Sequence, residues 1–279
     1  MFEYPEIKTL ARQMKNEIIG KTVQSIEEVE NIYSNENYSP CNNGTVKEIE
    51  CVAPGLYIML DNGYGIMMKD AGGKLLYNKT SSGIPKNYGV IIKFTDGSNI
   101  TYSAGLGACW LSSVSHEDWQ KQKADNKMFD PLAGNTFEDY IEFINSLPKY
   151  IINNNYILKN PIEEIKKPIK TFLSTNVFGV KSTFAAEILL YAKVYPSTQL
   201  RKLNEEQHKR IYNSMKFVLT SACEKGGRVN EFNLYGQKGN YIAMAERKHI
   251  GEDCPVCGTT LGKVSVGGVT AFCPNCQVK

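Results

Sequence analysis

Apolar residues near the start of the chain recur every three or four positions, which is the spacing of one face of an α-helix. These residues are Ile7, Leu10, Met14, Ile18 and Ile19. Pro5 stands in the first turn and Gly20 follows the last apolar position, as is usual at the two ends of a helix. The pattern therefore predicts an amphipathic helix from Pro5 to Gly20.

The hydrophobic period then changes. From Lys21 to Ser113, short runs rich in Val, Ile and Tyr alternate with turn signals. The sequences Asp61-Asn62-Gly63 and Asp96-Gly97 are typical of hairpin turns between strands. We therefore expect this region to form several antiparallel strands arranged as a sandwich or barrel.

Beyond the strand region, linker-type residues precede a return to helical spacing. The linker contains Asp125, Asn126, Asp130, Pro131 and Gly134. The expected helices run from Thr136 to Leu147, Pro161 to Leu173, Ser182 to Lys193 and Asn204 to Cys223. Asn160 and Asn204 are suitable N-caps for two of them. A domain boundary is therefore expected near residues 125–135, with the last thirty or so residues forming a third, small unit.

The composition is that of an ordinary globular protein. Of 279 residues, 42% are hydrophobic, 10% aromatic and 22% charged, which excludes a disordered, collagen-like or coiled-coil chain. The longest apolar candidate for a membrane span, Phe184 to Tyr195, is interrupted by Glu187 and Lys193. The first residues carry acids where a secretory signal carries basic residues. We expect a cytoplasmic protein with no membrane partner, and nothing in the sequence demands more than a monomer.

The charge is unevenly distributed along the chain. Residues 1–130 hold 13 basic and 16 acidic side chains, a balance of −3, whereas residues 131–279 hold 19 and 13, a balance of +6. The second half is therefore the electrostatic candidate for binding a polyanion. The alternative is that these lysines form a solvated surface.

Eight cysteines in a chain of this kind argue against a disulfide framework. Four are scattered and are expected to behave as small buried hydrophobic residues: Cys41, Cys51, Cys109 and Cys223. The other four form two C-x-x-C motifs separated by fifteen residues: Cys254, Cys257, Cys273 and Cys276. This spacing predicts a structural Zn²⁺ held by four thiolates, with no open position to activate water. A redox C-x-x-C is the alternative, but no βαβ pattern accompanies these motifs.

Two acids, Glu3 and Glu6, flank Pro5 at the start of the first expected helix. A carboxylate there is stabilised by the positive end of the helix dipole, by about 0.3–1 kcal/mol, and this alone explains Glu6. The acidic start acquires more meaning in combination with the strand-rich region, the helical region and the terminal cysteine motifs that follow in this order.

In this combination the chain resembles the formamidopyrimidine-DNA glycosylase and endonuclease VIII family of base-excision repair enzymes. The resemblance extends over essentially the whole chain, and it depends on the order and spacing of individually weak motifs. They are Glu3-x-Pro5-Glu6, Asp130-Pro131-Leu132, Ile169-Lys170-x-x-Leu173, Phe178-Gly179-Val180 before the helix that contains Glu187, Gly226-Gly227-Arg228, and Phe272-Cys273-Pro274-x-Cys276-Gln277.

The resemblance implies an α+β multidomain fold. Residues 1–125 are then an N-terminal helix plus an antiparallel β-sandwich, the catalytic-type domain. Residues 126–248 are a helix-two-turns-helix DNA-binding bundle, and residues 249–279 are a zinc ribbon hairpin. The implied partner is double-stranded DNA that contains damaged bases or abasic sites, so the protein is expected to be nucleoid-associated when bound.

The resemblance also implies catalytic roles. In this family an N-terminal amine attacks the sugar C1′ of an extruded nucleotide and forms a Schiff base. Glu3 matches the carboxylate that acts as an acid at the sugar, and Glu6 matches a supporting acid. The family has Pro at the position of Phe2. Because methionine aminopeptidases generally require a small second residue, we expect Met1 to be retained, with its amine one residue farther from Glu3.

Three mechanisms remain open at this point. The Met1 amine reaches the sugar from a shifted position, Glu3 activates water for simple hydrolysis, or catalysis is lost. Further departures from the family concern DNA contacts. Leu56 stands where a Lys follows the Gly of a hairpin, Ser182 aligns with an Asn, and Gly268 stands where an Arg contacts phosphate. These departures put strand cleavage in particular doubt.

Other cations are candidates for DNA contacts. Lys170 matches a family position, while Lys181, Ser182, Arg228 and Lys263 lie near the segments that the resemblance assigns to DNA binding. The leading hypothesis is a DNA glycosylase that removes oxidised bases, with weakened or absent lyase activity at abasic sites. The alternative is a catalytically inactive damaged-DNA-binding protein on the same scaffold. A zinc ribbon module that serves protein contacts is a more distant third.

Overall fold

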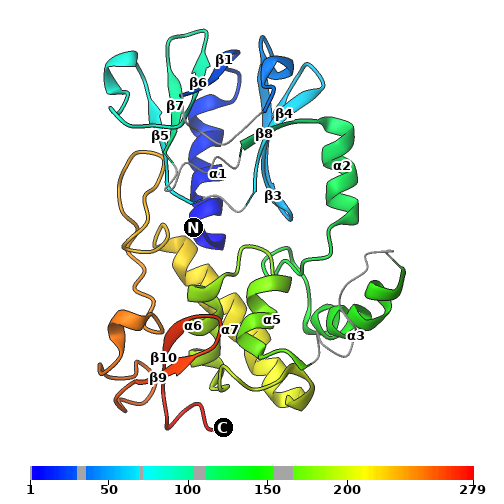
Figure 1. The fold of residues 1–279 in the computed structure, drawn as a ribbon, viewed down its shortest axis with the longest axis vertical. Coiled ribbons are helices and arrows are strands. Elements are labelled where there is room, and N and C mark those ends of the chain that lie inside the picture. Colours follow the sequence, from blue (N-terminus) through cyan, green and yellow to red (C-terminus); the bar gives the residue numbers. More distant parts are fainter. Residues whose placement is uncertain (1, 30–35, 70–71, 104–110, 154–165) are drawn as a thin grey trace. The chain divides into compact units, whose positions relative to one another are not determined.

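The computed structural model describes residues 2–29, 36–69, 72–103, 111–153 and 166–279, and for residues 148–153 the backbone only. Figure 1 shows the elements along the chain. Spatial contacts divide the chain into two units. The first unit comprises residues 1–126 and 222–241, and the second comprises residues 127–221 and 242–279. The three-part division predicted from the sequence stays a prediction.

The first unit begins with helix α1 (Tyr4–Ile18), close to the predicted bounds. Two four-stranded antiparallel sheets follow, in the orders β1-β6-β7-β5 and β2-β3-β4-β8. Their strands are β1 (Val23–Glu28), β2 (Val46–Val52), β3 (Gly55–Leu60), β4 (Tyr64–Met68), β5 (Lys74–Asn78), β6 (Val90–Phe94), β7 (Asn99–Ser103) and β8 (Leu111–Ser115). Short 3₁₀ turns occupy Ser39–Cys41 (η1) and Ser81–Gly83 (η2).

The turn signals lie where the sequence predicted them. Asp61-Asn62-Gly63 joins β3 to β4, and Asp96-Gly97 joins β6 to β7. Gly63 and Gly97 have φ values of 87° and 85°, which glycine adopts at little cost. Both pairs of strands are antiparallel, so these turns close hairpins.

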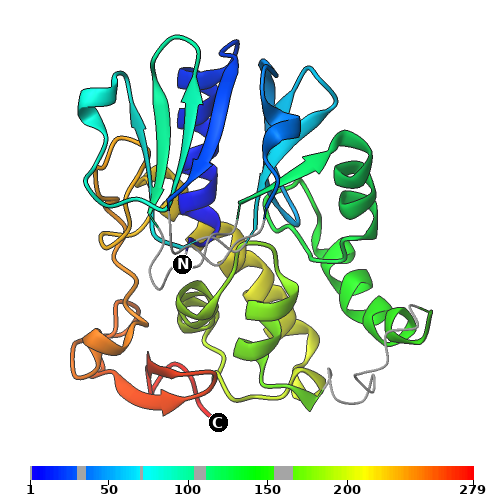
Figure 2. The same ribbon diagram turned by 45° about the horizontal axis from the view of Figure 1, so that its top comes forward.

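One hydrophobic core joins α1 to both sheets. Leu10 and Met14 from α1 lie in the same buried cluster as Ile92 of β6 and Ile58 of β3. Figure 2 shows α1 running alongside the two sheets. Alternating strand residues and one helix face thus meet in a dry interior, which is the physical basis of the sandwich.

Residues 222–241 join the first unit through specific hydrogen bonds. The backbone N–H of Tyr77 in β5 donates to the Leu234 carbonyl at 2.9 Å. The Leu234 N–H in turn donates to Oε1 of Gln13 on α1, also at 2.9 Å. Leu234 itself is buried in the core of the sandwich. A segment from late in the chain therefore completes the unit that the first residues begin.

Helix α2 (His116–Asp125) follows β8 and has no counterpart among the predicted helices. The Oγ of Ser115 accepts a hydrogen bond from the Asp118 N–H at 3.1 Å, which caps the helix. Trp119 is its buried anchor and stacks on Tyr57, with ring centroids 4.8 Å apart.

The second unit is mainly helical. Its helices are α3 (Phe137–Asn153), α5 (Ile169–Asn176), α6 (Ser182–Ala192) and α7 (Glu205–Glu224), of which α7 extends into the first unit at its end. Two 3₁₀ turns (η4, Leu200–Lys202; η5, Arg247–His249) and one hairpin of β9 (Gly262–Ser265) and β10 (Val269–Phe272) complete it. Asn204 caps α7 as predicted, because its side chain accepts from the Gln207 N–H at 2.9 Å.

The helix predicted from Pro161 to Leu173 differs in its bounds. Residues 161–165, together with the predicted cap Asn160, lie outside the described residues, and α5 begins only at Ile169. Pro168 lies immediately before the helix and pairs with Gln199 in an isolated bridge. A proline restricts the residue before it to extended conformations, which explains the late start. The predicted fold class, with its sandwich, helical bundle and terminal hairpin, is confirmed.

Candidate active site and zinc centre

The first turn of α1 positions two acids. Glu3 is the N-cap and Glu6 is the third helical residue, so the two form a capping box. The Glu3 N–H donates to Oε2 of Glu6 at 2.8 Å. Pro5 lies in this first turn, where its missing N–H is not needed. The same local signals that start the helix therefore hold both carboxylates in fixed positions.

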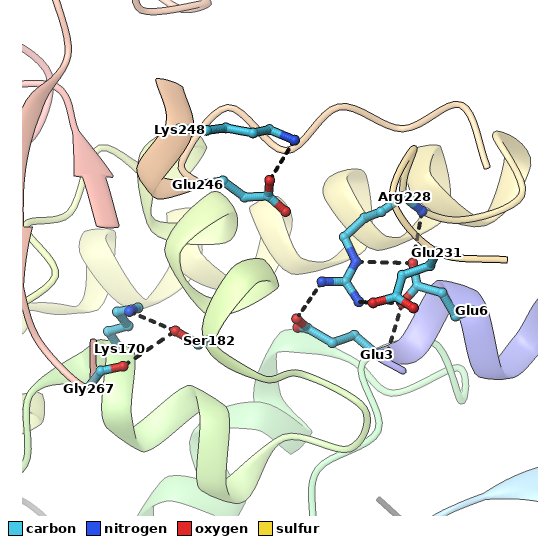
Figure 3. Close-up of polar contacts among 9 residues, drawn as sticks. All are labelled: Glu3, Glu6, Lys170, Ser182, Arg228, Glu231, Glu246, Lys248 and Gly267. Carbon is cyan, nitrogen blue, oxygen red and sulfur yellow. Dashed lines mark hydrogen bonds and ion pairs between the residues drawn. The ribbon is translucent and has the colours of Figure 1, made fainter. Parts of the chain in front are cut away.

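Arg228 connects these two acids (Figure 3). Its Nη1 lies 3.2 Å from Oε1 of Glu3, and its Nη2 lies 3.0 Å from Oε2 of Glu6. The three side chains are only 3%, 2% and 5% exposed, for Glu3, Glu6 and Arg228 respectively. Glu231 adds a third carboxylate, with Oε1 at 3.4 Å from Nη2. All four residues lie in the first unit. We call this group the acid centre.

The electrostatics of the acid centre follow from its charges. Burial disfavours the charged guanidinium, but attraction by Glu6 and then Glu3 outweighs it and raises the pKa of Arg228. A guanidinium at this distance in turn favours the ionised form of a carboxylate. Glu3 is thus held as an anion, a state in which it accepts a proton more readily than it donates one.

Glycine is required beside the acid centre. Gly227 has a φ of 95°, and a Cβ there would lie 3.0 Å from Oε1 of Glu6. A side chain at this position would be strained and would crowd the carboxylate. The sequence Gly226-Gly227 therefore lets the backbone of Arg228 approach Glu6, whose Oε1 accepts from the Arg228 N–H at 2.9 Å.

The residue before the acids is structural. Phe2 is fully buried and belongs to the hydrophobic core of the sandwich. Met1, the candidate source of a free amine, lies outside the described residues. Position 2 therefore offers an aromatic side chain to the core where the resemblance places the nucleophilic Pro.

The second unit contains the cysteine centre. The sulfur atoms of Cys254, Cys257, Cys273 and Cys276 all lie within 4.8 Å of one another. A tetrahedral zinc with Zn–S bonds of about 2.3 Å requires sulfur atoms about 3.8 Å apart, so the spacing fits. Each motif also donates backbone N–H groups to sulfur. The Val256 N–H points at Sγ of Cys254 at 3.4 Å, and the Cys276 N–H points at Sγ of Cys273 at 3.3 Å.

The environment prepares these thiols for metal. Hydrogen bonding, first from Thr259, lowers the pKa of Cys257 to about 5. Burial raises the pKa of Cys254 and of Cys276. Binding a divalent ion therefore displaces protons from the latter two thiols.

Glutamine and glutamate side chains attach the cysteine centre to α6. Gln277 accepts from the Cys273 N–H at 2.8 Å and donates to the Val194 carbonyl at 2.9 Å. Glu187, fully buried on α6, accepts from the Ala245 N–H at 2.8 Å. These buried contacts supply the outer shell that orients a metal site.

Lys170 links α5 to the tip of the β9–β10 hairpin (Figure 3). Its Nζ donates to Oγ of Ser182 at 3.0 Å and to the Val266 carbonyl at 2.9 Å, and the residue is buried. Two residues that the sequence suggested for DNA binding are thus brought together. Lys181 is the N-cap of α6, and Lys263 lies exposed on β9. Their DNA roles, like those of Lys170 and Ser182, stay predictions.

Comparison with known proteins places this geometry in context. A zinc finger found in FPG and IleRS matches residues 251–278. The formamidopyrimidine-DNA glycosylase of Lactobacillus helveticus is 27% identical over 100% of this chain and 99% of its own length. That of Exiguobacterium sibiricum is 26% identical over 99% of both.

The chain resembles the formamidopyrimidine-DNA glycosylases over its full length. This confirms the resemblance seen in the sequence. The solved structure of Lactococcus lactis Fpg with DNA containing an abasic site has the same fold, with a TM-score of 0.81 at 21% identity over 99% of this chain and 100% of that one. MutM (Fpg) from Thermus thermophilus gives 0.79 at 20% identity, over 99% and 98%.

The glycosylase-type zinc finger identifies the cysteine centre as a structural zinc site, as predicted. Cys254, Cys257, Cys273 and Cys276 would hold the ion, and four sulfur ligands leave no position for water. Among the described helices, none is both long and apolar enough to cross a bilayer.

The glycosylase resemblance found most of the site residues but did not pair them. Sequence reasoning assigned Arg228 to a DNA-recognition loop, whereas the structure places its side chain on Glu3 and Glu6. Glu231 was missed altogether. The local spacing Arg228-x-x-Glu231 was the only available signal, and such pairs are common on protein surfaces.

Proposed function

We propose that this protein binds damaged double-stranded DNA and removes an oxidised base by hydrolysis, without forming a Schiff base. The full-length similarity to formamidopyrimidine-DNA glycosylases supports the glycosylase class. Solved relatives are complexes with DNA that contains an abasic site or a carbocyclic 8-oxo-G. Such substrates are the class of ligand that we infer for this chain.

The observation that carries the proposal is the contact between Arg228 and Glu3. A guanidinium 3.2 Å from the buried Glu3 carboxylate keeps it ionised. An ionised carboxylate is unsuited to protonating the sugar ring oxygen, the step that follows imine formation. It is suited to accepting a proton from water.

Phe2 supports the same mechanism. Its side chain fills the core, so replacement of the family Pro by Phe has given position 2 a packing role. With Met1 retained, the nitrogen of Phe2 is an amide without a nucleophilic lone pair. Water is the remaining nucleophile that Glu3 can activate.

The proposed reaction balances as a simple hydrolysis. The water oxygen forms a bond to C1′ of the sugar while the bond from C1′ to the base nitrogen breaks, and the electron pair of that bond leaves with the base. Glu3 takes one proton from the water, and this proton balances the one that the departing base acquires. The sugar retains a 1′-hydroxyl, and both flanking phosphodiester bonds stay intact.

A second candidate function, binding without excision, is favoured by a different feature. Gly268, at the tip of the β9–β10 hairpin, has a φ of 102° and provides no cation where the resemblance expects Arg. Leu56 is buried where the resemblance expects Lys. A protein that recognises damaged duplex without completing the chemistry would tolerate both changes.

One experiment separates these functions. The full-length protein is incubated with duplexes that carry a single 8-oxoguanine, a formamidopyrimidine or an abasic site, with and without borohydride. Base release, strand cleavage, covalent trapping and binding are measured for the wild type, Glu3→Gln and the surface control Glu27→Gln. Glu27 is a half-exposed partner of Lys93, so its replacement tests only the loss of a charge.

Hydrolysis predicts base release without trapping or strand cleavage, abolished by Glu3→Gln and unchanged by Glu27→Gln. Covalent trapping of the wild type would establish an imine and exclude the proposed mechanism. Binding without release from any lesion would establish the second function. Absence of binding, or binding that does not weaken as salt is raised, would exclude a role that depends on phosphate contacts.

A further inference from the structure

A cavity of about 680 Å³ lies in the first unit, between α1 and β2. Its volume is in the range of small-molecule sites, which is about 300–1,000 Å³. It is lined by Lys8, Ala11, Arg12, Lys15, Glu48, Ile49, Glu50, Cys51, Val52 and Lys123. None of the four residues of the acid centre is among them. We call this the basic cavity.

Two of its four cations are already engaged by the protein. The Nζ of Lys8 donates to the Cys51 carbonyl at 2.7 Å and lies over the Tyr4 ring. The Nζ of Lys123 pairs with Oε2 of Glu50 at 2.9 Å, and that carboxylate also accepts from the indole N–H of Trp119. These contacts fix the walls of the cavity. They also neutralise Glu50, one of its two carboxylates.

The other two cations, Arg12 and Lys15, are exposed on α1. They are three residues apart and therefore lie on one face of the helix. Within the described part of the chain, no carboxylate lies at ion-pair distance from either side chain. An arginine and a lysine side by side, at the edge of a cavity, provide a planar fork and a point charge for one phosphate group.

The rest of the cavity complements the body of such a ligand. Val52 is 38% exposed and offers apolar surface, next to Ala11 and Ile49. Glu48 is exposed at the rim and is able to accept a hydrogen bond from a hydroxyl group. The lining thus combines cationic, apolar and hydroxyl-accepting groups in one place.

We propose that the basic cavity binds a small phosphate monoester that carries a hydroxylated ring, of the nucleoside monophosphate class. Arg12 and Lys15 hold the phosphate, Val52 contacts the ring, and Glu48 accepts from a hydroxyl. Along α1, Arg12 lies nine residues beyond Glu3, a rise of about 13 Å. This site is therefore separate from the acid centre and does not depend on base excision.

Thymidine 5′-monophosphate is a suitable probe, with thymidine as the ligand that lacks the phosphate. Titration calorimetry of the full-length protein is expected to show binding of the monophosphate and at least tenfold weaker binding of thymidine. The double variant Arg12→Ala/Lys15→Ala is expected to weaken monophosphate binding by roughly tenfold or more, because charge-assisted hydrogen bonds are lost. The matched control, Lys79→Ala/Lys86→Ala, removes two exposed cations of the same unit and should bind as the wild type does.

Glu3→Gln separates this proposal from the proposed reaction, since it should leave monophosphate binding unchanged. Equal binding by the wild type and the Arg12→Ala/Lys15→Ala variant would overturn the proposal, as would the absence of binding at millimolar monophosphate. If the double variant instead lost affinity only for duplex DNA, these cations would belong to a DNA surface and the small-ligand site would be wrong. Thermal unfolding checks that both double variants are folded.

Discussion

Arg228 grips Glu6 twice, once through its backbone and once through its side chain. The Arg228 N–H lies 2.9 Å from Oε1 of Glu6, while Nε and Nη2 lie 3.2 Å and 3.0 Å from its two oxygens. Glu6 also caps the first helix. The start of α1 is therefore fixed by a residue that lies 222 positions later in the chain.

This relationship predicts that Arg228→Ala will be strongly destabilising. Removing one partner of a buried ion pair leaves uncompensated charge and typically costs about 3–5 kcal/mol. Urea unfolding at neutral pH measures the change. The control is Arg201→Ala, which removes an exposed guanidinium that contacts only the side chain of Gln199 among the hydrogen bonds described. Similar stability of the two variants would contradict the role assigned to the buried pair.

Phe2→Ala is expected to lower the free energy of unfolding by about 3–5 kcal/mol, since it opens a cavity in the sandwich core. Phe217→Ala provides the matched control, because Phe217 is 57% exposed and makes one edge-to-face contact with Tyr191. It should cost about 1 kcal/mol or less. Chemical denaturation of both variants measures the difference. Equal losses would show that position 2 does not anchor the core.

Lys170→Met should destabilise the second unit by about 1.5–3 kcal/mol, because it removes a charged donor from the Val266 carbonyl and from Ser182. Lys263→Met, on the exposed side of the same hairpin, should be nearly neutral. Hydrogen exchange at the β9–β10 hairpin reports the local effect. Unchanged protection in Lys170→Met would mean that this lysine does not hold the hairpin tip.

Zinc content should be one ion per chain and should fall as the pH is lowered, since protons compete with the metal for thiolates. Cys254→Ser is expected to lose the ion, and Cys223→Ser, outside the cysteine centre, is expected to retain it. Metal analysis after dialysis measures both. Full zinc retention by Cys254→Ser would contradict ligation by all four cysteines.

Asp96 supplies a pH-dependent contribution in the first unit. A hydrogen bond from Lys21 is the main cause that lowers its pKa to about 2, from an ordinary value of 3.8. A carboxyl whose pKa is lower in the folded state stabilises the protein above pH 4, and this stabilisation is lost as the pH falls from about 4 to 2. Asp96→Asn should therefore flatten the acid limb of stability against pH. Asp125→Asn, an exposed control, should not.

The elements that sequence predicted best are those with strong local periodicity. Leu10 and Met14 mark one face of α1, and both are buried. Helix α2 was missed because Trp119 is its only buried residue, so the segment shows no apolar period. The start of α5 was misplaced because the restriction imposed by Pro168 outweighed the helical spacing before it.

The same distinction holds for the candidate site. The zinc ligands were predictable because their spacing within each motif is a local property of the chain. The pairing of Arg228 with Glu3 joins residues 225 positions apart. No periodicity or motif encodes such a contact, and a glycine-flanked arginine is equally compatible with a surface loop. Only the fold brings the three charges together.

The discontinuity of the first unit has a consequence for how the protein is made. During synthesis, the acids at positions 3 and 6 leave the ribosome long before the guanidinium that neutralises them. Until residue 228 has been translated, the nascent sandwich carries two uncompensated carboxylates and lacks Leu234 from its interior. A fragment that stops at residue 126 would remain in that unfinished condition, so the acid centre can mature only in a nearly complete chain.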